Sequence, residues 1–96
     1  MIDQPTTRIV AIDGARVRSL AEAHDYLARG LGLPPHYGRN LDALYDCLTT
    51  DVAGPLVIEW HATLATRRAI GPPFDRLRTA MEEAARTRAD LAVAFL

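Results

Sequence analysis

Two aspartates four residues apart are the residues of this chain best placed to do chemistry. Asp42 and Asp46 lie in a stretch whose leucines, at positions 41, 44 and 48, follow the period of an α-helix. Because residues at i and i+4 share one helix face, both carboxylates point to the same side, with Thr49 beside them. The two charges repel each other weakly in an isolated helix. Such a face is suited to accept charge-assisted hydrogen bonds from a cationic partner.

The remaining side chains of this helix form an apolar arc. Its members are Leu41, Leu44, Tyr45 and Leu48. We expect this arc to face a sheet, with Tyr45 at its border with the acidic face. In a later helix, Glu83 lies opposite the apolar Phe74, so we expect it to be exposed, and Glu82 extends the acidic patch. Exposed acids on a helix are also what an ordinary solvated surface shows.

The chain offers few residues for catalysis. His36 and Cys47 are close in sequence to the two aspartates, but Cys47 points about 100° away from Asp46 on the helical wheel. An enzyme needs a nucleophile, a base and an oxyanion site together, and this arrangement separates them. A metal site built from His36 and the aspartates lacks a visible second shell. We therefore predict a protein that is not an enzyme and carries no cofactor and no metal.

Three short apolar stretches are predicted as strands, at residues 8–12, 56–60 and 91–96. Between them, helices are expected from the capping box that begins at Ser19, from the N-cap Asn40 to about residue 51, weakly over 62–70, and from about 74 onward. The order is β-α-α-β-(α)-α-β, which predicts an α/β fold with a three-stranded parallel sheet packed by helices. The strands do not alternate cleanly, so we expect both faces of the sheet to be buried.

Composition is that of one soluble domain spanning residues 1–96, with residues 1–7 as a loose lead-in. Of the 96 residues 49% are hydrophobic, the formal net charge is −1, and there is one cysteine. No apolar stretch approaches the ~20 residues that cross a bilayer, and no export signal opens the chain. We expect a cytoplasmic protein that binds neither membrane nor nucleic acid, because carboxylates occupy its most promising face.

Residues 33–49 (LPPHYGRNLDALYDCLT) resemble the barstar family. That family shows a Leu-Pro-x-x-Tyr-Gly-x-Asn-Leu-Asp-Ala-Leu-aromatic-Asp-Cys-Leu-Thr run at this place. The similarity continues into residues 55–60 (PLVIEW) and reaches back to residues 12–14 (IDG) and the helix start at Ser19. The resemblance implies a barstar-like fold and a bacterial inhibitor that blocks, in a 1:1 complex, the active site of a secreted guanyl-specific ribonuclease.

The resemblance also implies roles for individual residues. Asp46 matches the acid that stands in for the substrate phosphate, and Glu83 matches an outlying acid that reaches a basic residue of the nuclease. The others match flanking contacts or the loop that shapes the approach. The implied partner-binding set is His36, Tyr37, Gly38, Asn40, Leu41, Asp42, Tyr45, Asp46, Thr49 and Glu83.

Four positions depart from the family's pattern. His36 replaces a tyrosine and would make binding depend on pH; Tyr45 replaces a tryptophan, Arg39 an acid and Asp51 an aromatic residue. These changes bear on which partner is bound, and a less basic ribonuclease is the natural match. The alternative is a barstar-fold interaction or immunity module, of the toxin–antitoxin kind, whose target is not a ribonuclease.

Overall fold

Three parallel strands form the single sheet of the described chain. The computed structural model describes residues 6–96, so most of the expected lead-in lies outside the described residues. Strands β1 (Arg8–Asp13), β2 (Leu56–His61) and β3 (Leu91–Phe95) pair in the order β1-β2-β3. Both pairings are parallel, as predicted.

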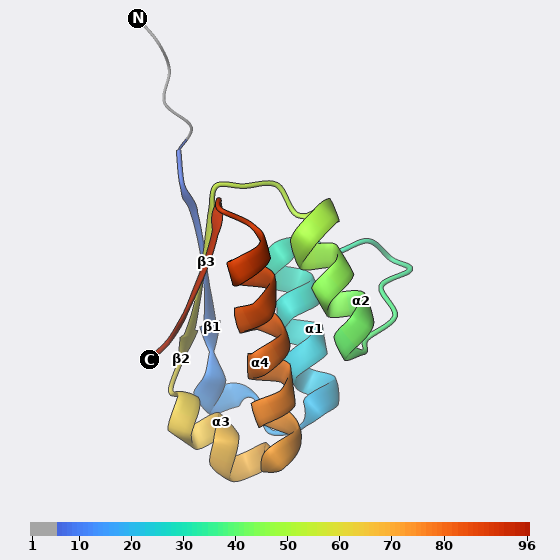
Figure 1. Cartoon of the computed structure of the whole chain (residues 1–96). Helices are drawn as coiled ribbons and strands as arrows, with labels where there is room; N and C mark the ends of the chain where they lie inside the picture. Colours follow the sequence, from blue (N-terminus) through green and yellow to red (C-terminus); the bar gives the residue numbers. More distant parts are fainter. Residues whose placement is uncertain (1–5) are drawn as a thin grey trace, which may run out of the picture.

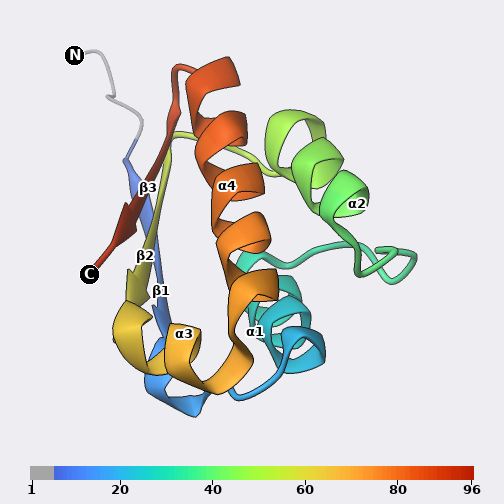
Figure 2. The same cartoon turned by 60° about the horizontal axis from the view of Figure 1, so that its bottom comes forward.

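The helices lie together on one side of this sheet (Figures 1 and 2). The four α-helices are α1 (Leu20–Leu31), α2 (Leu41–Asp46), α3 (Thr63–Ile70) and α4 (Pro72–Thr87). A short 3-10 turn, η1 (Gly14–Arg16), follows β1, and a π-helical turn, η2 (Cys47–Asp51), continues α2. The predicted order of elements is confirmed, and the helix expected to reach residue 51 does so with a widened last turn.

Local chemistry explains where α1 begins and ends. The hydroxyl of Ser19 accepts a hydrogen bond from the Glu22 amide (3.1 Å), as a capping box requires. The helix stops at Gly32, whose φ of 65° is the left-handed conformation that glycine adopts without strain. Gly30 lies inside α1. A Cβ there would stand 2.9 Å from Val10 Cγ1, so the glycine lets α1 approach β1 closely.

Trp60 is the centre of the core between sheet and helices. Its ring lies 5.3 Å from Phe74 and 6.4 Å from Phe95, between centroids, and it is fully buried. Its indole Nε1 donates to Thr66 Oγ1 (2.9 Å), and that hydroxyl donates to the Gly14 carbonyl (2.7 Å). The polar groups of the Trp60 and Thr66 side chains thus both have a hydrogen-bond partner inside the core. The contacts fix α3 against β2 and η1.

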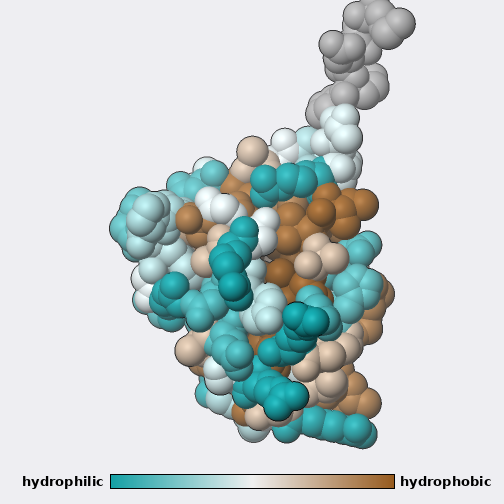
Figure 3. All heavy atoms as spheres, turned by 180° about the vertical axis from the view of Figure 1, so that it is seen from behind, coloured by the Kyte–Doolittle hydropathy of each residue, from teal (hydrophilic) through white to brown (hydrophobic). Residues whose placement is uncertain are grey.

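The opposite face of the sheet is not covered by helices, which corrects the expectation of burial on both faces. Along β1, Ile12 is buried whereas Ile9 is 60% exposed and Ala11 is exposed. The neighbouring strands continue this pattern, since Ile58 of β2 is buried and Ala92 of β3 is exposed. Apolar surface accordingly gathers on the side of the molecule that carries the strands (Figure 3). The strands do alternate, but apolar residues on the open face, such as Ile9 and Ala11, hide the alternation in the sequence.

Helix α2 packs on α4, not on the sheet, which corrects a second expectation. The sheet face is already occupied by α1, which contacts β1, and by α4, which contacts β3. The buried arc itself is right: Leu44 and Leu48 are fully buried, and Leu41 and Tyr45 are half-buried. As a result α2 forms an outer layer (Figure 2). Its polar residues Asp42 and Asp46 are exposed to solvent.

Candidate functional site

The start of α2 is fixed by the residue that precedes it. Asn40 Oδ1 accepts a hydrogen bond from the Ala43 amide (2.8 Å), and its Nδ2 donates to the Gly38 carbonyl (3.3 Å). This is the geometry of an N-cap that also closes the loop in front of it. Arg39 between them has φ 52°, a left-handed conformation rare for a residue with a side chain. Asn40 therefore orients the first turn, on which Asp42 lies.

Asp42 and Asp46 are both exposed on the solvent side of α2, as predicted. Within residues 6–96, neither carboxylate has an arginine or histidine nitrogen within 4.0 Å. Arg39, the nearest cation in the sequence, instead forms an ion pair with Asp25 of α1. Both carboxylates thus keep their hydrogen-bonding capacity for a group outside this part of the chain.

Glu83 faces the same region from α4, across a groove. The groove has a volume of about 530 Å³. It is lined by Leu41, Asp42, Tyr45, Asp75, Arg76, Thr79, Ala80 and Glu83. The structure therefore brings Asp42, Tyr45 and Glu83 together from two helices. The sequence reading missed the α4 positions 75, 76, 79 and 80, whose spacing of four marks one face of that helix.

A hydrogen-bonded chain joins the two sides of the groove. The hydroxyls of Tyr45 and Thr87 lie 3.0 Å apart, and Thr87 Oγ1 donates to the Glu83 carbonyl (3.0 Å). Since the Thr87 proton is engaged there, the Tyr45 hydroxyl is the donor of the first bond. Glu82 does not extend the free acidic patch, because Arg78 pairs with it at 3.5 Å.

The loop before α2 presents His36 to solvent and buries Tyr37. The Tyr37 hydroxyl lies 2.5 Å from His24 Nδ1, and the residue is 8% exposed. Burial, then the positive charge of Arg39, lowers the pKa of His24, and burial, then Cys47, raises the pKa of Tyr37. Both groups are therefore neutral near pH 7. Tyr37 was expected as a contact residue, but its side chain holds the loop from beneath.

The turn η2, which continues α2, contains Cys47 and Thr49. Cys47 is buried, and burial, followed by hydrogen bonding and charge from Asp51 and charge from Asp46, raises the pKa of its thiol. A protonated, buried thiol is a poor nucleophile. Thr49 is half-buried, and its hydroxyl donates to the Tyr45 carbonyl (2.8 Å), which leaves its oxygen as an acceptor. The arrangement suits binding of cations, not covalent chemistry.

Residues 6–96 contain neither a metal-binding cluster nor a membrane-spanning helix. No group of three or more histidine, cysteine, aspartate or glutamate side chains there is placed to hold a metal ion. None of the helices in residues 6–96 has the length and apolar character needed to cross a membrane.

Comparison with known proteins identifies a family model and a similar bacterial protein. A family model described as Barstar (barnase inhibitor) matches residues 7–96, from β1 to β3. A protein of Bacillus subtilis (strain 168) that bears the name "Putative ribonuclease inhibitor YrdF" is 47% identical over 51 residues. That alignment covers 53% of this chain and 56% of the relative's length.

Proposed function

Because the chain belongs to the barstar family, we propose that it inhibits a secreted guanyl-specific ribonuclease by presenting carboxylates in place of the RNA phosphates. Asp46 would occupy the place of a phosphate, with Asp42, Thr49 and Glu83 as flanking contacts. The complex would be 1:1 and would form inside the bacterial cell that makes the nuclease. Membership of a family of inhibitors agrees with the expectation that the chain is not an enzyme.

The observation that supports this proposal is the free acidic face of α2. Ribonuclease active sites are lined with cationic groups that stabilise phosphate charge in the transition state. Asp42 and Asp46 are exposed and have no cationic partner in the described residues. A fixed carboxylate accepts charge-assisted hydrogen bonds from such groups, and an arginine can donate two of them. Arrival of the cations also relieves the repulsion between the two aspartates.

The test is inhibition of a barnase-like ribonuclease, combined with titration calorimetry, for the wild type and for Asp46→Ala. We expect a stoichiometric complex for the wild type and a loss of at least about 100-fold in affinity for the variant, since central charged residues dominate such interfaces. Glu59→Gln is the matched control. It removes one negative charge from the open face of the sheet, where Glu59 pairs with His61 at 3.1 Å, and we expect it to bind normally.

The outcomes separate two functions. Unchanged affinity of Asp46→Ala would reject the phosphate-mimic mechanism while leaving an inhibitor that works in another way. Failure of the wild type to inhibit any of a panel of guanyl-specific ribonucleases would favour the alternative, an immunity module for a different target.

A further inference from the structure

The last turn of the acidic helix leaves a backbone carbonyl without a partner inside the helix. The Val52 amide donates to the Cys47 carbonyl, five residues back, at 3.0 Å. The Leu48 carbonyl, which would receive that amide in a regular α-helix, does not receive it. The regular part of α2 is six residues long, too short to persist by its own backbone bonds in water. The turn η2 therefore depends on contacts from outside the helix.

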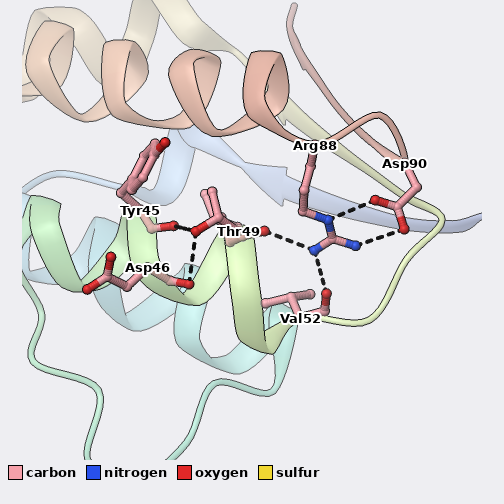
Figure 4. A network of polar contacts seen from close by, with 7 residues as sticks. Tyr45, Asp46, Thr49, Val52, Arg88 and Asp90 are labelled. Atoms are coloured by element: carbon pink, nitrogen blue, oxygen red, sulfur yellow. Dashed lines mark hydrogen bonds and ion pairs between the residues drawn. The ribbon is translucent and has the colours of Figure 1, made fainter.

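Arg88, just after the end of α4, supplies those contacts. Its Nη1 donates to the carbonyls of Leu48 (2.9 Å) and Val52 (2.5 Å). Its Nε and Nη2 donate to the two carboxylate oxygens of Asp90, at 2.8 and 3.0 Å. Figure 4 shows the side chain reaching from α4 to the end of η2, and it is 16% exposed. The guanidinium thus supplies the hydrogen bond that the Leu48 carbonyl does not receive from the Val52 amide.

The same turn is bonded to Asp46. The Thr50 hydroxyl donates to the Asp46 carbonyl at 2.6 Å. The Thr49 hydroxyl donates to the Tyr45 carbonyl at 2.8 Å and lies 3.3 Å from the Asp46 carbonyl oxygen. Displacement of η2 would therefore move the backbone of Asp46 and the side chain of Thr49 together (Figure 4). The proposed function places both of these residues in the binding surface.

Asp90 gives the arginine a fixed position and cancels its charge. Hydrogen bonds from Arg88 hold the pKa of Asp90 below its usual value, so the carboxylate stays charged. The Asp90 carbonyl accepts from the Leu56 amide (2.9 Å), which ties the pair to the start of β2. Gly54 makes room for it, because a Cβ there would overlap the Asp90 carboxylate. A neutralised guanidinium can cap the turn without lowering the negative potential around Asp46.

We propose that Arg88, held by Asp90, is a positioning residue that clamps the turn η2 and so fixes Asp46 and Thr49 for binding. The part of this inference that concerns binding rests on the proposed function. The contacts of Arg88 do not depend on it. Arginine is suited to the task because its planar fork bonds the carboxylate and the carbonyls at once, which a lysine ammonium does not.

The clamp itself is tested on the free protein. The variant Arg88→Ala/Asp90→Ala removes both partners and leaves the net charge unchanged. We expect amide hydrogen exchange in residues 47–52, followed by NMR, to become about tenfold faster or more, because two hydrogen bonds from a charged donor are lost. Amides in the centre of β2 should exchange as in the wild type. Arg16→Ala/Asp13→Asn is the control, since it breaks another Arg–Asp pair far from α2 and keeps the acceptor for the Ala15 amide.

The consequence for binding is tested with the ribonuclease. For Arg88→Ala/Asp90→Ala we expect dissociation to become about tenfold faster, with association within about twofold of the wild type because the surface charge is balanced. Added to Asp46→Asn, the pair of substitutions should cost much less than it does alone, since the positioned group is already gone. When the same pair of substitutions is added to Glu83→Gln, a change on α4, it should weaken binding by as much as it does alone.

The results distinguish the clamp from the function. Wild-type exchange rates in residues 47–52 of the variant would overturn the clamp. Full additivity with Asp46→Asn would overturn its positioning role, leaving Arg88 as a contributor to stability alone. A wild type that binds no guanyl-specific ribonuclease would overturn the proposed function and with it the binding role, while the exchange measurement would still decide whether the turn is clamped.

Discussion

Beneath the loop that leads into α2, a buried hydrogen bond joins His24 of α1 to Tyr37. The bond places two ionisable groups in an apolar region, and each remains neutral because burial opposes its charged form. Arg39, paired with Asp25 nearby, adds to the cost of protonating His24. At the residue scale, the loop is thus supported by a contact that is sensitive to acid.

A pH dependence of stability follows from this contact. The pKa of His24 is below its usual 6.5 in the folded protein, so the unfolded chain takes up the proton first as the pH falls. The contribution to stability is fully present above the unfolded-state pKa and decreases as the pH falls toward the folded-state value. Urea unfolding at about pH 7.5 and about pH 5 should show a smaller loss of stability for His24→Gln than for the wild type. Equal losses would show that His24 is not the group responsible.

The N-cap Asn40 gives a second prediction at this scale. Asn40→Ala should lower the free energy of unfolding by about 1 kcal/mol and weaken binding of the ribonuclease, because the first turn that carries Asp42 loses its cap. Ser19→Ala removes the equivalent cap of α1 and should cost a similar amount of stability. Calorimetry on both variants checks the difference: equal binding by the two would mean that the start of α2 does not control the site.

At the scale of elements, η1, β2 and α3 pack closely together at Gly14, where there is no room for a side chain. A Cβ on Gly14 would stand 2.6 Å from Trp60 Nε1 and would overlap the His61 carbonyl and the Thr66 hydroxyl. Gly14→Ala should therefore destabilise the protein by about 3 kcal/mol or more. Gly32→Ala is the comparison, since nothing lies within 4 Å and only its positive φ is unfavourable, at about 1 kcal/mol. Urea unfolding followed by circular dichroism measures both, and similar costs would contradict the packing described.

Elements and their faces were predictable because they depend on residues near each other in sequence. The Ser19 and Asn40 caps, the apolar arc of α2 and the three strands all follow from local periods and are confirmed. The exposure of Asp42 and Asp46 follows from the same wheel. These features need no knowledge of the neighbouring elements.

Contacts between distant elements were not predictable in the same way. The period of α2 shows which side is buried but not that α4, rather than the sheet, covers it. The bonds from Arg88 to Leu48 and Val52 span 40 and 36 residues, and in the sequence Arg88 is one of several arginines after an apolar stripe. The widened turn that needs this arginine also has no local signal. The groove and the clamp therefore emerge from packing alone.

For the whole molecule, the net charge of −1 hides an uneven distribution of charge. Acids without a cationic partner in the described residues meet at the α2–α4 side, whereas Asp13, Asp25 and Asp90 are each paired with an arginine. Attraction of the cationic nuclease that we propose as the partner would then be a local effect, felt over about one Debye length.

Association kinetics test this distribution. Raising the salt concentration should slow association with the ribonuclease far more than it speeds dissociation. Asp42→Asn and Glu83→Gln should each lower the association rate and weaken its salt dependence, whereas Glu59→Gln should leave both nearly unchanged. Stopped-flow measurements over a range of salt concentrations provide the check, and an association rate that ignores salt would contradict it.

The burial of Trp60 among Phe74 and Phe95 has an optical consequence. Trp60 is the one tryptophan of the sequence. Helix α2, which forms the outer layer on the helical side, contains none. Tryptophan emission of the free protein is therefore a built-in probe of whether the core around Trp60 is packed, and it needs no added label.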